Sequence, residues 1–367
     1  MRCSTRPSAL RARGWASMRP NSTSARLASA AFGAAFAFGC GGGQPAITEC
    51  VAAGPLTPVC QFQNPEDLAV VGDWILVSQL PAGKKPGSLV AFRPSDAAIR
   101  PLYPLDGDTT SQGACGAGLA PPAADFAPHG IDLAGTTLLV VNHASREAIE
   151  EFALGADADG PTLEWRHCTP LPDDASANDV AALNAGGFVA TTMHERPKLL
   201  GMLKLALGAN SGALLRFAPG ATGWETVPNT EGRGPNGVEE APDGTLYIAE
   251  WAAQRVVRIA PDGSGRAEIP LDFSPDNFSW ASDGRLLATG QRASTLELPS
   301  CLSVESGTCP LASVVAAIDP RTLAVTKLVD EDPAATIGAA SIAVEHSGAL
   351  WIGTFAGDRL VRREGTN

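Results

Sequence analysis

The sequence predicts an all-β fold, a six-bladed β-propeller, and a recurring pattern is the main reason. Six segments share a turn-like start, an apolar–polar alternation, a Gly/Asp turn and a second apolar run. Most are followed by further strand-like runs, such as SLVAFRP and RVVRIAPDG, which gives about four strands per unit. The units start 40 to 64 residues apart, and 39 glycines and 29 prolines supply frequent turns. Six units of this size are typical of a propeller.

The six segments follow one another through the chain, and each reads as two short strands joined by a tight turn. They are PEDLAVVGDWILVSQL from Pro65, PHGIDLAGTTLLVVNH from Pro128, ANDVAALNAGGFVATTMH from Ala177, PNGVEEAPDGTLYIAEW from Pro235, PDNFSWASDGRLLATGQ from Pro275 and AASIAVEHSGALWIGTF from Ala339. The PDG and SDG turns are clear hairpin signals. A pair of β-sandwiches would not explain why one pattern recurs six times.

The N-terminal region predicts a targeting segment. Residues 1–39 contain six arginines and no acidic residue, and Leu27–Phe38 is small and apolar. This run is too short for a bilayer, which takes ~20 residues, so residues 1–40 predict a signal peptide. Ala37–Cys40 resembles a bacterial lipobox, which leaves lipidation of Cys40 and simple cleavage as alternatives. We therefore expect an exported protein, either in the cell envelope (lipid-anchored or periplasmic) or secreted.

Residues 41–59 are expected to form a linker and N-terminal segment, and residues 60–367 the propeller domain. The net charge of −12 argues against nucleic-acid binding, which needs clustered Lys and Arg. Six cysteines follow the leader, and export would place them where disulfides persist. Cys50 and Cys60 lie close in sequence, as do Cys301 and Cys309, which would leave Cys115 with Cys168. Six cysteines allow fifteen pairings, so other connectivities stay open.

Aligning the repeats on their first apolar residue reveals a polar register. Two places earlier stand Glu66, His129, Asn178, Asn236, Asp276 and Ala340. One place earlier stand Asp67, Gly130, Asp179, Gly237, Asn277 and Ser341. Equivalent positions of a propeller lie around its axis, so five of the six blades direct a polar side chain toward one point. Turn formation explains any one of these residues but not their shared register. Carboxylate and amide oxygens in such numbers are what Ca²⁺ accepts.

At these residues the sequence resembles the paraoxonase/arylesterase family of calcium-dependent six-bladed propellers. It is more distantly similar to the senescence marker protein/gluconolactonase family. The resemblance covers about residues 60–364 and is most specific in PHGI…LLVVNH, the AND before VAAL, PNGV…APDGTLYIAE and LDFSPDN.

The resemblance implies two calcium ions, which would be the cofactors. A catalytic ion would be held by Glu66, Asn178, Asn236, Asp276 and Asn277. A deeper, structural ion would take Asp67, Asp179 and the backbone carbonyl of Ile131. His129 and His143 match the histidine dyad of the family, and His194 matches a further histidine near its pocket.

These matches predict a calcium-dependent hydrolase of lactones or aryl esters. Calcium would polarise the carbonyl of the small-molecule substrate, and His129 would remove a proton from the attacking water. His143 ends the next strand and would orient His129 or share its proton, although it could also be purely structural. Asp276 counts with the catalytic residues as well as with the metal ligands. The chain lacks GxSxG, HExxH and P-loop motifs. A sugar lactonase and a non-catalytic, calcium-stabilised binding propeller are the alternatives.

The sequence also contains one predicted helical insert and departs from the family in one disulfide. Residues 196–210, RPKLLGMLKLALGAN, predict a short, mostly apolar helix near the active-site face. It could be a lid or, like Cys40, a membrane contact. The mammalian members of the family join their terminal regions by a disulfide, but the C-terminus here has no cysteine. We therefore expect Cys60 to pair with Cys50, and strand pairing alone to close the ring.

Overall fold

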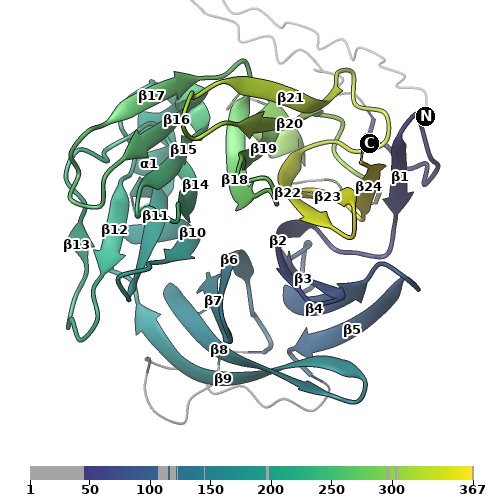
Figure 1. The fold of residues 1–367 in the computed structure, drawn as a ribbon, viewed down its shortest axis with the longest axis horizontal. Coiled ribbons are helices and arrows are strands. Elements are labelled where there is room, and N and C mark those ends of the chain that lie inside the picture. Colours follow the sequence, from purple (N-terminus) through teal and green to yellow (C-terminus); the bar gives the residue numbers. More distant parts are fainter. Residues whose placement is uncertain are drawn as a thin grey trace, which may run out of the picture. The chain divides into compact units, whose positions relative to one another are not determined.

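Six four-stranded antiparallel sheets surround a common axis in the computed structural model (Figure 1), which confirms the predicted propeller. The structure describes residues 45–105, 115, 121, 123–143, 145–195, 198–294, 297–301, 304 and 306–365. The predicted signal peptide and Cys40 lie outside these residues.

Each of the first five blades uses four strands in chain order, beginning with the strand nearest the axis. Blade 1 consists of β2 (Pro65–Val71), β3 (Trp74–Gln79), β4 (Ser88–Arg93) and β5 (Ala98–Tyr103). Blade 2 consists of β6 (Pro128–Ala134), β7 (Thr137–Asn142), β8 (Ala148–Asp157) and β9 (Gly160–Pro170). Blade 3 consists of β10 (Ala175–Ala182), β11 (Phe188–Glu195), β12 (Leu214–Phe217) and β13 (Glu225–Thr226).

The remaining blades follow the same plan, except that the outermost strand of blade 6 comes from the N-terminal part of the chain. Blade 4 consists of β14 (Pro235–Glu240), β15 (Leu246–Glu250), β16 (Arg255–Ile259) and β17 (Ala267–Pro270). Blade 5 consists of β18 (Ser274–Trp280), β19 (Leu286–Arg292), β20 (Ala312–Ile318) and β21 (Val325–Glu331). Blade 6 consists of β22 (Ala340–His346), β23 (Ala349–Thr354), β24 (Leu360–Glu364) and, outermost, β1 (Leu56–Val59).

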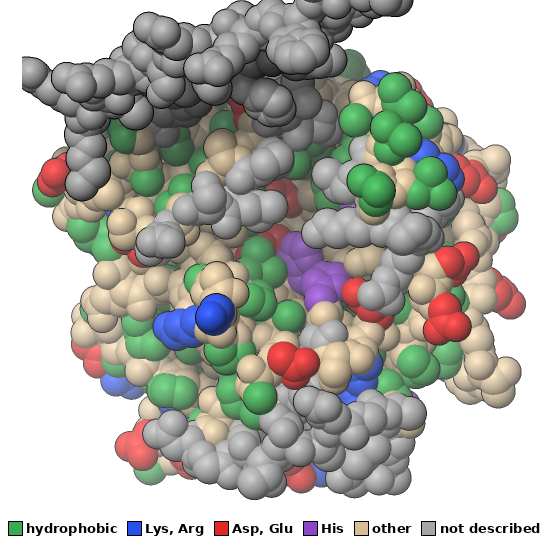
Figure 2. Space-filling view, turned by 180° about the vertical axis from the view of Figure 1, so that it is seen from behind, with side chains coloured by type: hydrophobic (Ala, Val, Ile, Leu, Met, Phe, Trp, Pro, Cys, Tyr) green, Lys and Arg blue, Asp and Glu red, His purple; other side chains and the backbone are tan. Residues whose placement is uncertain are grey.

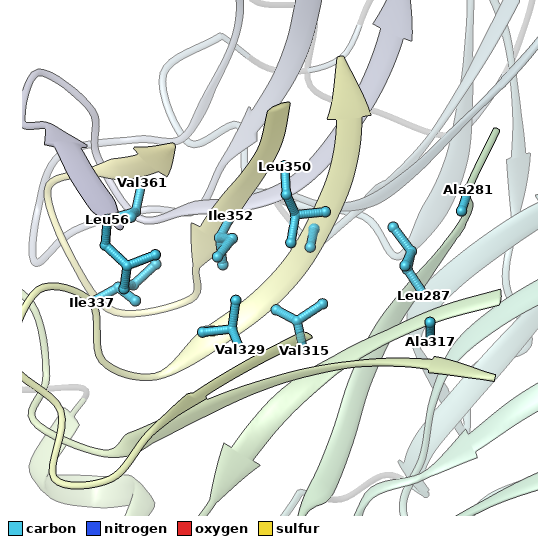
Figure 3. Packing of buried hydrophobic residues seen from close by; sticks show 12 residues of the cluster. Leu56, Ala281, Leu287, Val315, Ala317, Val329, Ile337, Leu350, Ile352 and Val361 are labelled. Carbon is cyan, nitrogen blue, oxygen red and sulfur yellow. The ribbon is translucent and has the colours of Figure 1, made fainter. Parts of the chain in front are cut away.

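Hydrophobic side chains fill the seams between blades, because alternate residues of a strand point to opposite faces of its sheet. In β3, Ile75 and Val77 pack toward blade 6, whereas Leu76 packs toward blade 2. Each of the six seams holds one such cluster of buried residues. Figure 3 shows the seam between blades 5 and 6, where Val315 lies near Leu350. The apolar residues of each repeat therefore form the core between blades, and the polar residues of the aligned register lie near the axis.

Strand pairing closes the ring, as expected. β1 pairs antiparallel with β24, and Leu56 lies opposite Arg363. The first strand of the ring therefore begins at Leu56, four residues before the expected start of the propeller domain at residue 60. The four-residue segment LTPV carries no repeat pattern, and its pairing partner lies at the other end of the chain.

All three expected disulfides are present, and each crosslinks a different part of the chain. They join Cys50 to Cys60, Cys115 to Cys168 and Cys301 to Cys309. The first one spans β1, so it anchors the strand that closes the ring. The fully buried Arg359 adds to this anchor by donating to the carbonyl oxygens of Ile47 and Glu49.

Glycine permits the innermost strands to approach one another at two positions of the aligned register. A Cβ atom on Gly130 would lie 2.2 Å from Asp179 Oδ1, and one on Gly237 would lie 2.4 Å from the carbonyl oxygen of Asp276. Both distances are too short for a real contact, so any larger side chain would push neighbouring blades apart. Blades 2 and 4 therefore carry glycine where blades 1 and 3 carry aspartate.

The predicted insert forms a helix, α1 (Lys198–Ala206), between β11 and β12. Its Leu205 is buried beside Gly234, at the start of the innermost strand of blade 4. Two shorter helical segments are η1 (Trp251–Ala253) and α2 (Leu298–Cys301). No helix within the described residues is long and apolar enough to cross a bilayer.

Candidate metal and proton-transfer site

Every innermost strand contains a β-bulge at the aligned polar register. The pairing of β2 with β3 shifts between Pro65 and Asp67, and that of β6 with β7 shifts between Pro128 and Ile131. The same shift occurs in β10, β14, β18 and β22. A bulge releases residues from the ladder and re-aims their side chains, and bulges are frequent beside active sites. The repeated bulge, which the sequence did not reveal, explains why the two aligned positions of the blades supply polar side chains near the axis.

The first group of side chains is named the oxygen cluster here. It comprises Glu66, Asn178, Asn236, Asp276 and Asn277, all of them buried. Asn277 Nδ2 donates to Glu66 Oε1 at 2.6 Å, although the two residues belong to blades 5 and 1. Asn236 also hydrogen-bonds Asp276 across neighbouring blades. Side chains that the sequence places far apart therefore meet near the axis.

Four oxygens of this cluster lack hydrogen-bond partners within the described part of the chain. They are Glu66 Oε2, Asn178 Oδ1, Asn236 Oδ1 and Asn277 Oδ1. Leaving one buried polar atom unsatisfied costs about 1–3 kcal/mol, so four in one cluster point to a missing partner. Each orphaned atom is an acceptor, so the partner that fits them is a cation or a donor.

The chemistry of the cluster fits a hard divalent cation. Two carboxylates and three amides offer only oxygen, which Ca²⁺ prefers in loose geometry. Among the described residues, no three His, Cys, Asp or Glu side chains converge as a metal-binding group. The cluster differs from such a group because three of its four orphaned acceptors are amide oxygens.

Burial controls the charge of the two carboxyl groups in the metal-free chain. Desolvation raises the pKa of Glu66 well above its usual value, and nearby Asp67 and Asp276 raise it further. Desolvation also raises the pKa of Asp276 to about 7. A cation bound among these oxygens would oppose both shifts, because it favours the ionised form.

The second group is named the aspartate ties here and consists of Asp67 and Asp179. Asp67 accepts the N–H groups of Leu68 at 2.8 Å and Ile131 at 2.6 Å, one with each oxygen. Asp179 accepts those of Val180 and Val238, both at 2.8 Å. Blade 1 is thereby tied to blade 2, and blade 3 to blade 4.

The aspartate ties differ from the oxygen cluster because none of their oxygens is orphaned. Burial raises the pKa of Asp67 to about 7 and that of Asp179 well above its usual value. An ion held here with the carbonyl of Ile131 would have to share oxygens that already accept main-chain N–H groups. The hydrogen bonds give both aspartates a structural role with or without an ion.

The two predicted histidines meet beside the oxygen cluster. His129 Nδ1 lies 2.9 Å from His143 Nε2, which is hydrogen-bonding distance. His129 Nε2 lies 3.6 Å from Glu66 Oε1. The side chains of His129 and His143 are 20 % and 24 % exposed, so solvent reaches both rings. Figure 2 shows histidine side chains near the middle of one face, with acidic side chains close by.

The remaining predicted residue, His194, lies near the end of β11. It stands opposite Ser176 of β10, two positions before Asn178, and is half-buried. The structure thus places it in the blade that supplies Asn178 to the cluster.

Three residues that support the site were missed by the sequence analysis. Glu147 Oε2 lies 2.8 Å from His143 Nδ1. Trp251 Nε1 donates to Gln291 Oε1 at 2.9 Å, and Gln291 Nε2 donates to Asp276 Oδ2. Gln291 and His143 both stand at or just past the end of the second strand of a blade. Because His143 was already predicted, extending the register alignment to these strand ends would have found Gln291 as well.

The chain matches no protein-family model and no curated protein by sequence. Its structure is similar to that of a protein described as a candidate gluconolactonase, with a TM-score of 0.52 and 15% identity over 88% of this chain and 92% of that one. The PQQ-bound aldose sugar dehydrogenase of Streptomyces coelicolor gives a TM-score of 0.51 at 14% identity, covering 84% of this chain and 98% of that one. Virginiamycin B lyase of Staphylococcus aureus gives 0.50 at 14% identity, with the same two coverages. At such identities these likenesses establish the propeller fold, which these proteins use for different chemistries.

Proposed function

We propose that the protein is a calcium-dependent hydrolase of lactones or aryl esters, of the paraoxonase/arylesterase type. One observation carries the proposal: four orphaned acceptor oxygens lie beside a hydrogen-bonded histidine pair. A cation site next to a proton acceptor supplies the two groups that a metal-assisted attack of water on a carbonyl uses.

Each part of the site has a distinct role in the proposed reaction. Calcium, when bound, would polarise the substrate carbonyl and stabilise the developing oxyanion. Glu66, Asn178, Asn236, Asp276 and Asn277 would hold the ion. His129, whose Nε2 lies 3.6 Å from Glu66 Oε1, would accept the proton of the attacking water. His143 would hold His129 in position through the 2.9 Å contact between their rings.

The decisive experiment measures hydrolysis of phenyl acetate, aliphatic lactones and glucono-1,5-lactone by the mature domain, with Ca²⁺ and with EDTA. We expect turnover that EDTA abolishes, Ca²⁺ restores and Asn236→Ala lacks. Preference for the sugar lactone would favour the gluconolactonase alternative. Absence of any turnover, with a melting temperature that EDTA still lowers, would instead indicate a calcium-stabilised binding propeller.

We propose further that the protein is exported. The three disulfides support an oxidising compartment. The leader of residues 1–40 remains a prediction that N-terminal analysis of the mature protein would test, together with the lipidation of Cys40.

Helix α1 supports a membrane contact more than a lid. Leu199, Leu200, Leu203 and Leu207 are 84%, 48%, 53% and 76% exposed, while Leu205 alone anchors the helix among the described leucines. A lid would bury this face against the protein, whereas an interfacial helix leaves it for lipid. Figure 2 shows hydrophobic side chains gathered at the edge of the face that carries the histidines.

A further inference from the structure

The segment that carries His143 is held firmly on both sides. It connects β7 to β8, and His143 N donates to the carbonyl oxygen of Ala127 at 3.0 Å. Three side chains converge on the fully buried Glu150: Asn142, Arg146 and Trp165, at 2.8 to 3.0 Å. These partners on both flanks of the connection restrict the positions that the side chains of His143 and Glu147 can take.

Glu147 lies within this connection and faces the histidine pair. Its Oε2 lies 2.8 Å from His143 Nδ1, and its carbonyl oxygen accepts the N–H of Leu171 at 3.0 Å. His143 Nε2 in turn lies 2.9 Å from His129 Nδ1. The three side chains form a continuous chain of hydrogen bonds that ends at the oxygen cluster.

The chemistry of the three groups determines which atom of each hydrogen bond carries the proton. An ionised carboxylate only accepts hydrogen bonds, so the proton between Glu147 and His143 lies on His143 Nδ1. A neutral His143 then presents a lone pair at Nε2, which requires the proton on His129 Nδ1. His129 is left with a lone pair at Nε2, the atom that lies 3.6 Å from Glu66 Oε1. This is the tautomer in which His129 accepts a proton beside the cluster.

We propose that Glu147 is the positioning residue that fixes the tautomer of His143 and, through it, turns the basic nitrogen of His129 toward the oxygen cluster. The proposal rests on the proposed function for its kinetic consequence, but the tautomer itself is a property of the folded chain. Glu147 touches neither substrate nor metal in this scheme and acts only through His143.

The first test is spectroscopic and needs no activity. Ring ¹⁵N shifts of His143, assigned by their loss in His143→Gln, should show the proton on Nδ1 in the parent protein. Glu147→Leu removes the acceptor, so the proton should redistribute toward Nε2. Glu151→Leu, on the neighbouring strand β8 and outside the hydrogen-bond chain, is the matched control and should leave the shifts unchanged. An Nδ1-protonated His143 in Glu147→Leu would overturn the proposal.

The second test is kinetic. Glu147→Leu should lower kcat about 10- to 100-fold with KM changed less than about twofold, since the lost interaction serves proton transfer rather than binding. Glu147→Asp should restore part of the rate. In a His143→Gln background, Glu147→Leu should have no further effect, because both residues act as one unit. An additive loss, or a loss confined to KM, would overturn the positioning role.

The two tests separate this proposal from the proposed function. Redistribution of the His143 proton without any hydrolase activity in the parent protein would refute the hydrolase and support the positioning of His143. Hydrolysis that is unaffected by Glu147→Leu would support the hydrolase and refute the role of Glu147.

Discussion

The oxygen cluster and the aspartate ties occupy neighbouring positions of the same strands but are satisfied in opposite ways. Glu66 and Asn178 each keep an orphaned oxygen, whereas Asp67 and Asp179, one residue later, accept main-chain N–H groups with every oxygen. The ties join blades and serve the fold. The cluster contributes unsatisfied acceptors at a cost in stability, which is typical of a site prepared for a ligand. In blades 1 and 3, a step of one residue thus separates a structural role from the proposed functional one.

The largest expected effect comes from Glu66→Gln, which keeps the size of the side chain and removes its charge. Activity should fall about 100-fold or more, because the ion would lose one of its two carboxylates. Titration calorimetry should show bound calcium reduced by one equivalent relative to the parent. The metal-free variant should be at least as stable as the metal-free parent, since a buried carboxyl group is gone. A variant that keeps both calcium and turnover would remove Glu66 from the site.

The neighbouring substitution Asp67→Asn should act on stability instead. An asparagine keeps one acceptor oxygen, so one of the two buried N–H groups of Leu68 and Ile131 loses its partner. We expect the free energy of unfolding to fall by about 1–3 kcal/mol in EDTA, measured by urea denaturation beside Glu66→Gln. If both variants changed the free energy of unfolding equally, the distinction between the oxygen cluster and the aspartate ties would be wrong.

The pH dependence of stability should sharpen the same comparison. Burial raises the pKa of Asp67 and Asp276 to about 7, whereas an unfolded chain has aspartate pKa values near ~3.9. Between these limits the folded metal-free chain binds more protons than the unfolded one, so its stability falls as pH rises from about 4 to 7. The ion-paired Asp157 and Asp330 have a pKa lowered to about 2, so their contributions change only at more acidic pH.

Melting temperatures in EDTA from pH 5 to 8 would measure this fall. Calcium should raise the melting temperature more at pH 8 than at pH 5, because ionised cluster carboxylates bind it. Asp276→Asn should make the calcium-induced rise in melting temperature less dependent on pH. The pH dependence that comes from the aspartate ties should remain. A metal-free stability that rises over this range would contradict the burial of these groups.

The smallest effect on turnover is expected outside both regions, on helix α1. Leu199→Asp and Leu203→Asp should weaken binding to phosphatidylcholine vesicles by roughly tenfold or more, since a buried leucine contributes about 1.5–3 kcal/mol. Hydrolysis of soluble phenyl acetate should change by less than about twofold. Val325→Asp, at an exposed position of β21, is the matched control. Reduced hydrolysis with unchanged vesicle binding would identify a lid.

The sequence was sufficient for the blades and for the axial register, because each repeat carries its own alternation and turn. The same register located the residues of the cluster and of the ties together. It could not separate Glu66 from Asp67, because the bulge in β2 and the approach of Ile131 from blade 2 decide which oxygens are satisfied. Glu147 could not be predicted for a related reason. Its contact with His143 depends on how the connection after β7 folds back, and the periodicity of the sequence does not specify that.

The pairing of β1 with β24 has a consequence for biosynthesis. Leu56 and Arg363 stand opposite each other, so all the residues between them must be translated before the sixth sheet has its outermost pair. Until then the N-terminal strand has no partner, and blade 6 presents an open edge that invites association with other chains. Contacts of such long sequence separation slow folding. The disulfide between Cys50 and Cys60 acts on this waiting strand, because it limits the conformations available to its residues before the last strand arrives.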